Sequence, residues 1–308
     1  RDLSFARFGS VSSAMEWCLA QREAGKTIGF VATMGALHEG HLGLVRRSVS
    51  TCDVTVVSVF VNPLQFEDPG DLERYPRDLD GDARQLEEAG CDMMFTGTLP
   101  EFFPDSIDEM GSLEPGTLMS PGPCAHGLEG VSRAGHFIGV ATIVHRLFEV
   151  VSPTRAFFGR KDYQQALIVA EVARRRGGPE IEVCPTSREE DGLARSSRNQ
   201  HLSESGREAA VVLSQALACC DAQWRSGVRA PEVLQATLAA PFKSAPGVRL
   251  EYAAVRDTTQ WTAGDPSGPL ENCVALVAAR VGPVRLIDNL ILGEGETCEI
   301  PRGAGLRA

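Results

Sequence analysis

The segment TIGFVATMGALHEGH, residues 27–41, decides the fold of this chain. Its first half is a continuous apolar run that predicts a buried strand ending at Thr33, and a helical pattern follows from about Leu42. His38 and His41 lie between the two, with two glycines that let the backbone approach a ligand closely. A helix start offers unpaired N–H groups and a partial positive charge, and residues three apart share one side of its first turn. The segment favours phosphate binding, and it leaves a helix cap and a pair of metal ligands open as alternatives.

Strands and helices of this kind alternate through the first two-thirds of the chain. The predicted strands cover residues 27–33, 54–60, 92–95, 155–158 and 181–183. The amphipathic stretches between them predict helices at residues 42–52, 79–89, 140–151 and 163–175. Apolar β-branched runs are typical of a parallel sheet that is covered on both faces. We therefore expect an α/β fold with a Rossmann-like, doubly wound parallel sheet, whose ligands bind at the carboxyl ends of the strands.

The pattern changes near residue 200. Helices near residues 204–224 and 231–239 precede strands near residues 249–255, 273–281 and 284–290. The sequence VGPV at residues 281–284 predicts a hairpin turn. We therefore expect a Rossmann-like domain over residues 1–199 and a smaller C-terminal α+β domain over residues 200–308. Residues 113–133 are rich in glycine and proline and predict a loop or lid.

Composition restricts the kinds of partner. The 308 residues carry a net charge of −11, which argues against nucleic acid because phosphate backbones are bound by basic surfaces. No apolar run approaches the ~20 residues that span a bilayer, and no signal peptide is visible. The chain begins with Arg1 rather than Met, so we expect a few native residues before it. We expect no membrane partner.

The cysteines favour a reduced, cytoplasmic protein. There are nine, an odd number, with no CxxC pair and no zinc-type spacing. Most lie in or beside apolar runs, which predicts buried thiols. Cys219 and Cys220 are adjacent within a helical pattern, where a structural disulfide is implausible. No neighbour that would activate a thiolate is apparent, so a catalytic cysteine is disfavoured.

Two further motifs follow predicted strands. FVNPLQF at residues 60–66 offers the amides of Asn62 and Gln65 among apolar neighbours, which suits a small hydroxylated acid, although an Asn-Pro turn explains the pattern equally well. FFGRKDYQQ at residues 157–165 places Lys161 within reach of phosphates and Asp162 within reach of a ribose hydroxyl. A charged helix cap is the alternative for this second motif and is compatible with ligand binding.

Two more segments are polar. DGLARSSRN at residues 191–199 combines hydroxyls with the forked donors of Arg198, which suits pyrophosphate, and a solvated loop that caps the next helix is the favoured alternative. RAGHFIGV at residues 133–140 contains His136, which either orders a site or packs as a satisfied core histidine. Walker A, GxGxxG and nucleophile-elbow motifs are missing from the sequence. Their absence removes the common ATPase, dehydrogenase and hydrolase interpretations.

Taken in order along essentially the whole chain, these segments resemble the pantoate–β-alanine ligases, a family of HxGH nucleotidylyl transferases. The resemblance is carried by TMGALHEGH, VNPLQF with the following YPR, RAGHFIGVATIV, FFGRKDYQQ, DGLARSSRN and ARVGPVRLIDN. It implies ATP-dependent ligation of pantoate and β-alanine through pantoyl adenylate, with release of pyrophosphate and then AMP. It also implies Mg²⁺, cytoplasmic location, a homodimer, and a C-terminal lid domain beside an ATP- and pantoate-binding domain.

The resemblance also implies roles for residues that match the family's motifs. For catalysis these are His38, His41, Lys161 and Arg198. The ATP-binding set comprises Met34, His38, His41, Gly159, Lys161, Asp162, Ser196, Ser197 and Arg198. The pantoate-binding set comprises Gln65, Gln165, Met34 and Asn62, and no protein residue is assigned to a metal.

Two positions depart from the family pattern. Gly-Arg-Lys at residues 159–161 replaces the usual Gly-Glu-Lys, and Arg195 replaces a hydrophobic residue. Each adds a positive charge beside the expected ATP site. Two rival functions are a nucleotidylyl transferase that makes a dinucleotide and a nucleotide-binding protein without catalysis. The uncharged VNPLQF segment disfavours the first, and retention of both histidines, Lys161 and Arg198 disfavours the second.

Overall fold

The computed structural model describes residues 4–67, 69–108 and 112–294. The chain forms two compact units. The first unit comprises Arg1–Ala125, Glu129–Phe158 and Gln164–Glu182. The second comprises His126–Leu128, Gly159–Tyr163 and Val183–Ala308.

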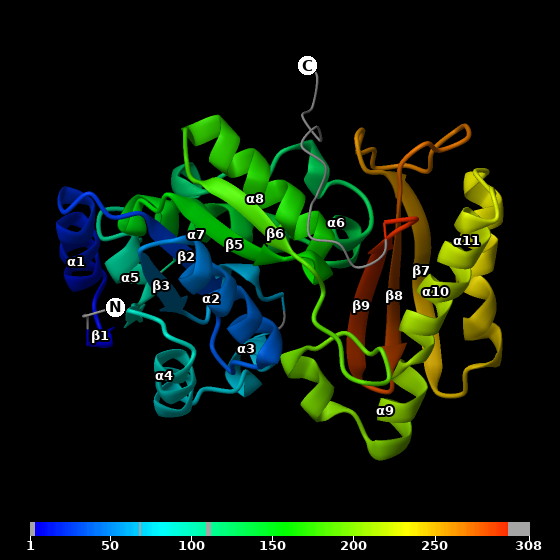
Figure 1. The fold of residues 1–308 in the computed structure, drawn as a ribbon, viewed down its shortest axis with the longest axis horizontal. Helices are drawn as coiled ribbons and strands as arrows, with labels where there is room; N and C mark the ends of the chain where they lie inside the picture. The colour runs from blue at the N-terminus through cyan, green and yellow to red at the C-terminus, as the bar shows by residue number, and fades with distance from the viewer. Residues whose placement is uncertain (1–3, 68, 109–111, 295–308) are drawn as a thin grey trace. The chain divides into compact units, whose positions relative to one another are not determined.

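The first unit is built on a six-stranded sheet with the strand order β1-β4-β3-β2-β5-β6 (Figure 1). Its strands are β1 (Ala6–Phe8), β2 (Ile28–Thr33), β3 (Val54–Val59), β4 (Met93–Phe95), β5 (Arg155–Gly159) and β6 (Glu180–Cys184). The pairs β1–β4, β4–β3, β3–β2 and β2–β5 are parallel. The predicted doubly wound sheet is confirmed, and its five predicted strands end within a residue or two of the observed ones. The prediction missed β1, because three residues are too few to show a period.

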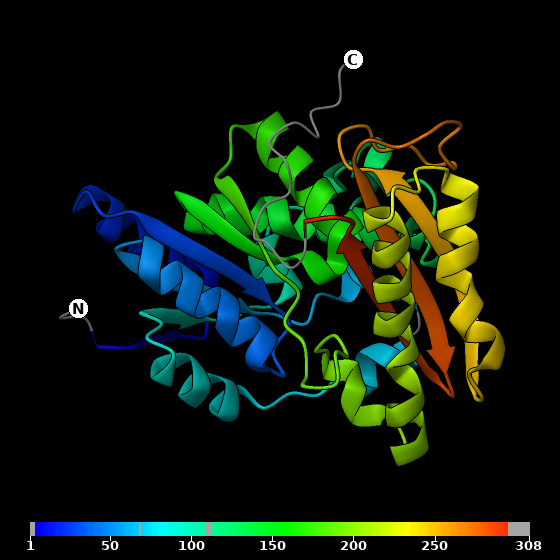
Figure 2. The same ribbon diagram turned by 45° about the vertical axis from the view of Figure 1, so that its right-hand side comes forward.

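Helices cover the sheet on both faces (Figure 2). The helices of this unit are α1 (Val11–Glu23), α2 (Glu39–Thr51), α3 (Pro69–Arg74), α4 (Leu79–Glu88), α5 (Leu99–Phe102), α6 (Glu129–Ser132), α7 (His136–Val151) and α8 (Tyr163–Arg176). Successive residues of β2 face opposite layers, as in any strand. Ile28 and Phe30 lie in the core with α1 and α7, whereas a Cβ on Gly29 would overlap the Ser48 hydroxyl of α2. The sheet is thus buried on both sides, as its apolar strands predicted.

The strand order reverses between β2 and β5. The chain runs from β2 to β3 and β4 in one direction, and from β5 to β6 in the other. Ligands of open α/β sheets bind outside the carboxyl ends of the strands at such a switch point. The loop that follows β2 is the segment of His38 and His41. Topology therefore singles out the same segment as the sequence.

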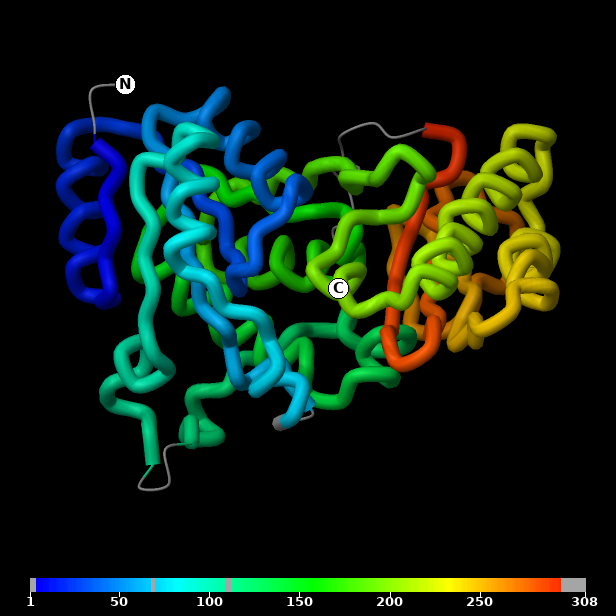
Figure 3. Tube along the Cα trace, turned by 90° about the horizontal axis from the view of Figure 1, so that it is seen from below, coloured from blue at the N-terminus to red at the C-terminus, as the bar shows by residue number. Residues whose placement is uncertain are grey.

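The second unit contains an antiparallel sheet of β7 (Val248–Asp257), β8 (Cys273–Val281) and β9 (Val284–Ile291). Gly282 and Pro283 form the predicted hairpin turn between β8 and β9. Its helices are α9 (Glu204–Ala210), α10 (Val212–Arg225) and α11 (Pro231–Ala239), and Figure 3 shows α10 and α11 side by side. Leu217, Leu234 and Val277 lie in the core that these helices share with the sheet. The single helix predicted over residues 204–224 is interrupted at Val211.

Short 3-10 turns complete the fold. They are η1 (Pro63–Gln65), η2 (Pro115–Thr117), η3 (Pro123–Ala125), η4 (Arg160–Asp162), η5 (Ser197–His201) and η6 (Ala240–Ser244). Residues 113–133, predicted as a loop or lid, contain two of these turns and the short helix α6. None of the helices within the described ranges has the length and apolar character needed to cross a bilayer.

The eight cysteines in the described ranges are free thiols. Burial raises the pKa of Cys18 and Cys220 to about 12, so both stay neutral at ordinary pH. Cys219, in contrast to its neighbour Cys220, is exposed. These environments give buried thiols no nucleophilic character.

Candidate active site

The loop between β2 and α2 turns through two residues with positive φ. Gly35 has φ +80° and Ala36 has φ +51°. A Cβ on Gly35 would lie 2.8 Å from Asp82 Oδ2 and 3.0 Å from Val59 Cγ1, so glycine is required by both conformation and space. Thr33, at the end of β2, donates its hydroxyl to the Ser58 carbonyl at 2.8 Å and accepts from the Gly35 N–H at 3.2 Å. These bonds anchor the start of the loop.

Asp82 of α4 holds the middle of this loop. Its carboxylate is 2% exposed and accepts from the Ala36 N–H at 3.1 Å and the Leu37 N–H at 2.9 Å. Burial raises the pKa of the Asp82 carboxyl above its usual range, and the two N–H donors oppose that rise. The sequence pattern missed Asp82, since it lies near Asp78 and Asp80 in an ordinary acidic helix start. Its role depends on a loop 45 residues away, which no local pattern reveals.

His38 caps α2. Its Nδ1 accepts from the Gly40 N–H at 3.1 Å, so the proton of the neutral ring lies on Nε2. The rings of His38 and His41 stack with their centroids 4.1 Å apart and an interplanar angle of 28°. The helix-cap alternative is thus realised, but it uses only one ring nitrogen of one histidine. Capping and phosphate binding are compatible.

These contacts change one expectation about the helix start. The sequence predicted unpaired backbone N–H groups, yet those of Ala36 and Leu37 bind Asp82 and that of Gly40 binds His38. Side chains of the same unit therefore satisfy these three donors. The imidazole N–H groups and the dipole of α2 are further features of this segment that suit an anion.

The turn after β3 brings together Met34, Asn62 and Gln65. Asn62, which is 2% exposed, accepts from the Leu64 N–H at 3.2 Å and donates to Gln65 Oε1 at 3.1 Å and to the Gly139 carbonyl at 3.2 Å. Gln65 Nε2 donates to Met34 Sδ at 2.9 Å. The Asn-Pro turn is therefore present, and Asn62 orients the Gln65 amide within it. This geometry favours an indirect role for Asn62.

His136 and Gln164 order neighbouring loops. His136 is 4% exposed, with Nδ1 3.0 Å from the Gln65 carbonyl and Nε2 2.9 Å from Arg133 Nη1. Both alternatives for His136 are therefore realised in part. The side chain is buried like a core histidine, and its contact with the Gln65 carbonyl braces the η1 turn. Gln164 donates to the Cys124 carbonyl at 2.8 Å and accepts from the Glu129 N–H at 3.1 Å. Gln165, the next residue of α8, is half-buried.

In the second unit, Gly159 precedes the η4 turn, which carries Lys161 and Asp162. Lys161 Nζ lies 3.9 Å from Asp162 Oδ1, and their side chains are 18% and 45% exposed. Arg160, one of the two departures from the family pattern, is 2% exposed and so does not project into solvent. The η4 turn therefore contains a partly exposed lysine next to a buried arginine.

The segment Ser196–Arg198 lies at the start of η5, where Ser196 Oγ accepts from the Arg198 N–H at 3.3 Å. The residues before it are held by ion pairs. Arg207 bonds to Glu189 at 2.8 Å and Asp191 at 2.6 Å, and these bonds hold the pKa of both carboxyls below their usual range. The loop is thus braced by ion pairs rather than loosely solvated, and the residue that caps α9 is Ser203, outside the segment.

Known proteins resemble this chain over most of its length. The family model described as pantoate-beta-alanine ligase matches residues 7–291. The pantothenate synthetase of Rubrobacter xylanophilus is 46% identical over 274 residues, which cover 88% of this chain and 93% of that protein. The chain belongs to the pantoate-beta-alanine ligase family.

Solved structures agree with this assignment. The pantothenate synthetase of Thermus thermophilus has a TM-score of 0.81 and 39% identity, and the match covers 92% of this chain and 98% of that one. The pantoate-beta-alanine ligase of Francisella tularensis, complexed with beta-gamma ATP and beta-alanine, has a TM-score of 0.75 and 31% identity. That match covers 96% of this chain and 100% of the other. The resemblance inferred from the motifs is therefore confirmed.

The predicted site residues fall into two sets. The first unit holds Met34, His38, His41, Asn62, Gln65 and Gln165, and the second holds Gly159, Lys161, Asp162, Ser196, Ser197 and Arg198. Hydrogen bonds join Met34, Asn62 and Gln65, and ring stacking joins the histidines. Within the described ranges, no cluster of three or more His, Cys, Asp or Glu side chains could hold a metal ion.

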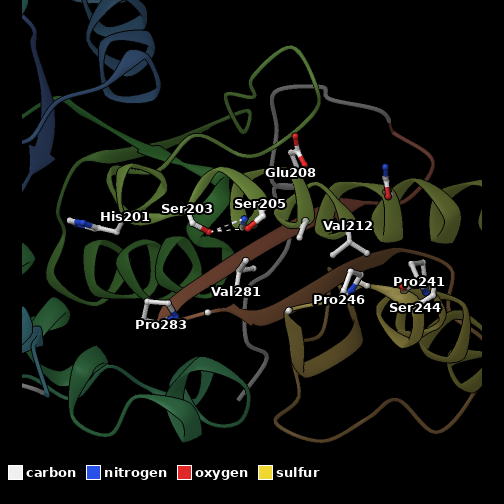
Figure 4. Close-up of a pocket in the computed structure, with 16 residues that line it drawn as sticks. His201, Ser203, Ser205, Glu208, Val212, Pro241, Ser244, Pro246, Val281 and Pro283 are labelled. Atoms are coloured by element: carbon white, nitrogen blue, oxygen red, sulfur yellow. Dashed lines mark hydrogen bonds between the residues drawn. The ribbon is translucent and has the colours of Figure 1, made fainter.

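A groove of about 1010 Å³ lies elsewhere in the second unit (Figure 4). Its walls come from the start of α9 and α10, the η6 turn and the β8–β9 hairpin, and include His201, Glu208, Pro246 and Pro283. Among the described residues, those predicted to bind substrates do not line this groove. It is a separate surface feature of the second unit.

Proposed function

We propose that this chain ligates pantoate to β-alanine at the expense of ATP, through pantoyl adenylate. One observation carries the proposal: the HxGH-type pair His38 and His41 follows β2 at the switch point of the sheet, in a chain whose residues 7–291 match the ligase family. The structure of the Francisella tularensis relative with beta-gamma ATP and beta-alanine supports the same substrates.

The reaction has two displacements. A pantoate carboxylate oxygen attacks the α-phosphorus of ATP, and the bond from phosphorus to the pyrophosphate oxygen breaks. The β-alanine amine then attacks the carbonyl carbon of pantoyl adenylate, the bond to AMP breaks, and the amine loses a proton. Neither step needs a covalent enzyme intermediate. Catalysis then depends on positioning two anions together and stabilising charge on phosphorus.

The residues of the first unit supply two parts of this chemistry. The Nε2–H of the neutral His38 ring is suited to donate to a phosphate oxygen, with His41 stacked beside it. Gln65 and Gln165 bind the hydroxyl and carboxyl oxygens of pantoate, with Asn62 orienting Gln65. Met34 supplies apolar contact for the methyl groups of pantoate and lies beside ATP.

The residues of the second unit bind the nucleotide. Lys161, Ser196, Ser197 and Arg198 donate to the triphosphate, and Gly159 and Asp162 lie at the adenosine. Cations and hydroxyl donors are suited to hold the leaving pyrophosphate as its charge develops. Mg²⁺ enters with ATP, as the Mg-ATP substrate.

Three further proposals concern the domains, the assembly and the cellular location. The change of helix and strand pattern near residue 200 supports an ATP- and pantoate-binding domain at residues 1–199 and a C-terminal lid domain at residues 200–308. Membership of the family supports a homodimer. The free thiols of the described cysteines support a cytoplasmic location.

Pyrophosphate release tests the function. Mg-ATP with pantoate alone is expected to give a burst of pyrophosphate equal to the enzyme concentration, and addition of β-alanine is expected to start multiple turnover. Well-folded protein that releases no pyrophosphate in response to pantoate would contradict the proposal. Two alternatives would then remain: a related ligase with a different acid substrate, or a protein that binds nucleotide without catalysis.

Arg195 gives a prediction about the departure from the family pattern. Its Nε donates to the Arg188 carbonyl at 3.2 Å, so the side chain braces its own loop. Arg195→Met is therefore expected to keep kcat within about tenfold of the wild type, a barrier change of at most ~1.4 kcal/mol. Steady-state kinetics with all three substrates measures it. A collapse of kcat with the fold intact would instead make Arg195 a catalytic residue.

A further inference from the structure

Two adjacent residues of β9, Asp288 and Asn289, bond to both segments of the second unit that carry the proposed ATP-binding residues. Both are buried, at 3% and 2% exposure. Their backbones pair with β8 in the antiparallel sheet, where Asp288 lies opposite Val277 and Asn289 opposite Leu276. Their side chains also form hydrogen bonds to segments outside the sheet.

Asn289 holds the η4 turn. Its Nδ2 donates to the Arg160 carbonyl at 2.9 Å and to the Lys161 carbonyl at 2.8 Å. One amide group therefore uses both of its protons on two successive peptide units, a contact across 128 residues of chain. Fixing both peptides fixes the direction in which the Lys161 side chain leaves the backbone.

Asp288 holds the loop that leads to Ser196. Its carboxylate accepts from both terminal nitrogens of Arg188, at 2.7 and 3.1 Å, in a bidentate pair. Arg188 also donates to the Gly192 carbonyl at 3.0 Å, and its backbone forms a bridge with Ala194. Arg188 thus connects the loop of residues 188–194 to β9. This loop immediately precedes the residues predicted to bind the triphosphate.

A purely structural strand would not need these side chains. Burying a charge or an amide is unfavourable unless every polar atom is paired, and apolar residues of similar volume often stabilise a core as well. Asp288 also accepts from the backbone N–H of Asn289 at 2.8 Å, which couples the two residues. A coupled polar pair that bonds to two separate loops is suited to fix the geometry of both.

We propose that Asn289 and Asp288 are positioning residues for ATP, with Asn289 acting through Lys161 and Asp288 through the loop of Ser196–Arg198. This inference rests on the proposed function, because it takes the nucleotide roles of Lys161 and Ser196–Arg198 from it. The antiparallel sheet thereby contributes to nucleotide binding without contacting the nucleotide.

The test is a double-mutant cycle between residues 289 and 161. Asn289→Leu keeps the branched side-chain skeleton and removes the donor, and Lys161→Ala removes the cation. The Kd of Mg-ATP is measured by calorimetry for the wild type, both single variants and the double variant. We expect Asn289→Leu to raise the Kd of Mg-ATP about tenfold or more, because the Lys161 ammonium loses its alignment with the phosphates. In the Lys161→Ala background, the same substitution is expected to change the Kd little.

Glu251→Gln is the matched control. Glu251 lies on β7 of the same sheet and pairs with Arg280 at 2.8 Å and Arg285 at 2.7 Å, so its loss disturbs the sheet without touching either loop. We expect this variant to bind Mg-ATP like the wild type. Asp288→Asn, which keeps the shape but weakens the Arg188 pair, serves as a second variant should Asn289→Leu fail to fold, and it is also expected to weaken ATP binding.

The outcomes separate this inference from the proposed function. An effect of Asn289→Leu that is equal in the presence and absence of Lys161, or no larger than that of Glu251→Gln, overturns the positioning role. Unchanged binding in Lys161→Ala overturns it as well. Wild-type protein that releases no pyrophosphate in response to pantoate overturns the function alone, since the binding cycle is read without catalysis.

Discussion

Replacing His41 with alanine is expected to lower kcat for pantoate-dependent pyrophosphate release about 10²–10³-fold, the typical effect of losing one preorganised donor to a developing negative charge. The His41 ring stacks on His38 at 4.1 Å, beside the start of α2. His41 does not cap the helix, so its loss is expected to leave the thermal unfolding midpoint near that of the wild type. Single-turnover release of pyrophosphate, followed by a coupled phosphate assay, measures the chemical step.

His38 allows the cap and the catalytic role to be separated. Asparagine is among the best N-cap residues, so His38→Asn is expected to retain stability, whereas His38→Ala is expected to lose about 1 kcal/mol. Both variants remove the imidazole Nε2–H and are expected to lose activity to a similar degree. Activity that survives in His38→Asn but not in His38→Ala would show that the histidine serves only as the cap seen at Gly40.

Replacing Gly139 with alanine is expected to lower stability by about 1–3 kcal/mol and to raise the KM for pantoate about tenfold or more. A Cβ at this position of α7 would overlap the Leu64 carbonyl and lie 2.8 Å from the Gln65 backbone nitrogen. Both obstacles are backbone atoms, so the η1 turn must move as a whole. That movement would also break the 3.2 Å bond from Asn62 to the Gly139 carbonyl. Thermal unfolding and a pantoate titration at saturating ATP measure the two effects.

Gly43 is the matched control for this substitution. It lies in α2 with open space where a Cβ would be, so Gly43→Ala is expected to stabilise the protein by roughly 0.5–1 kcal/mol through helix propensity. If Gly139→Ala instead gave the same stability as Gly43→Ala and an unchanged KM for pantoate, α7 and the η1 turn could move apart without loss of stability. The close packing of the pantoate region would then have no functional consequence.

The sequence predicted the strands well, because each depends on near neighbours. Residues 273–281 were predicted as a strand with the bounds that β8 has, and residues 27–33 differ from β2 by one residue. Most helix starts were also predicted: α4, α8, α9 and α11 begin at the residues expected for them. Two begin about a turn before the predicted residue, α2 at Glu39 and α7 at His136. At α2 the start depends on the His38 cap, a side-chain contact that periodicity does not record.

The residues proposed to carry the chemistry were predicted from the sequence, whereas the residues that hold them in place were not. His38, Gln65 and Lys161 lie directly after strands, so the carboxyl-end rule finds them. Asp82, Gly139 and Asn289 act on segments 45, 77 and 128 residues away. Their contacts exist only once the chain has folded.

The sequence by itself thus determined the fold class and the family and predicted the reacting groups, since periodicity and motif order are local properties of the chain. Only the tertiary structure decided that Asp82 occupies two backbone donors of the β2–α2 loop, and that Asn289 holds the peptides of the Lys161 turn. The physical reason is that a buried polar side chain must find partners wherever the fold brings them. Its partner is therefore chosen by packing in three dimensions rather than by spacing along the chain.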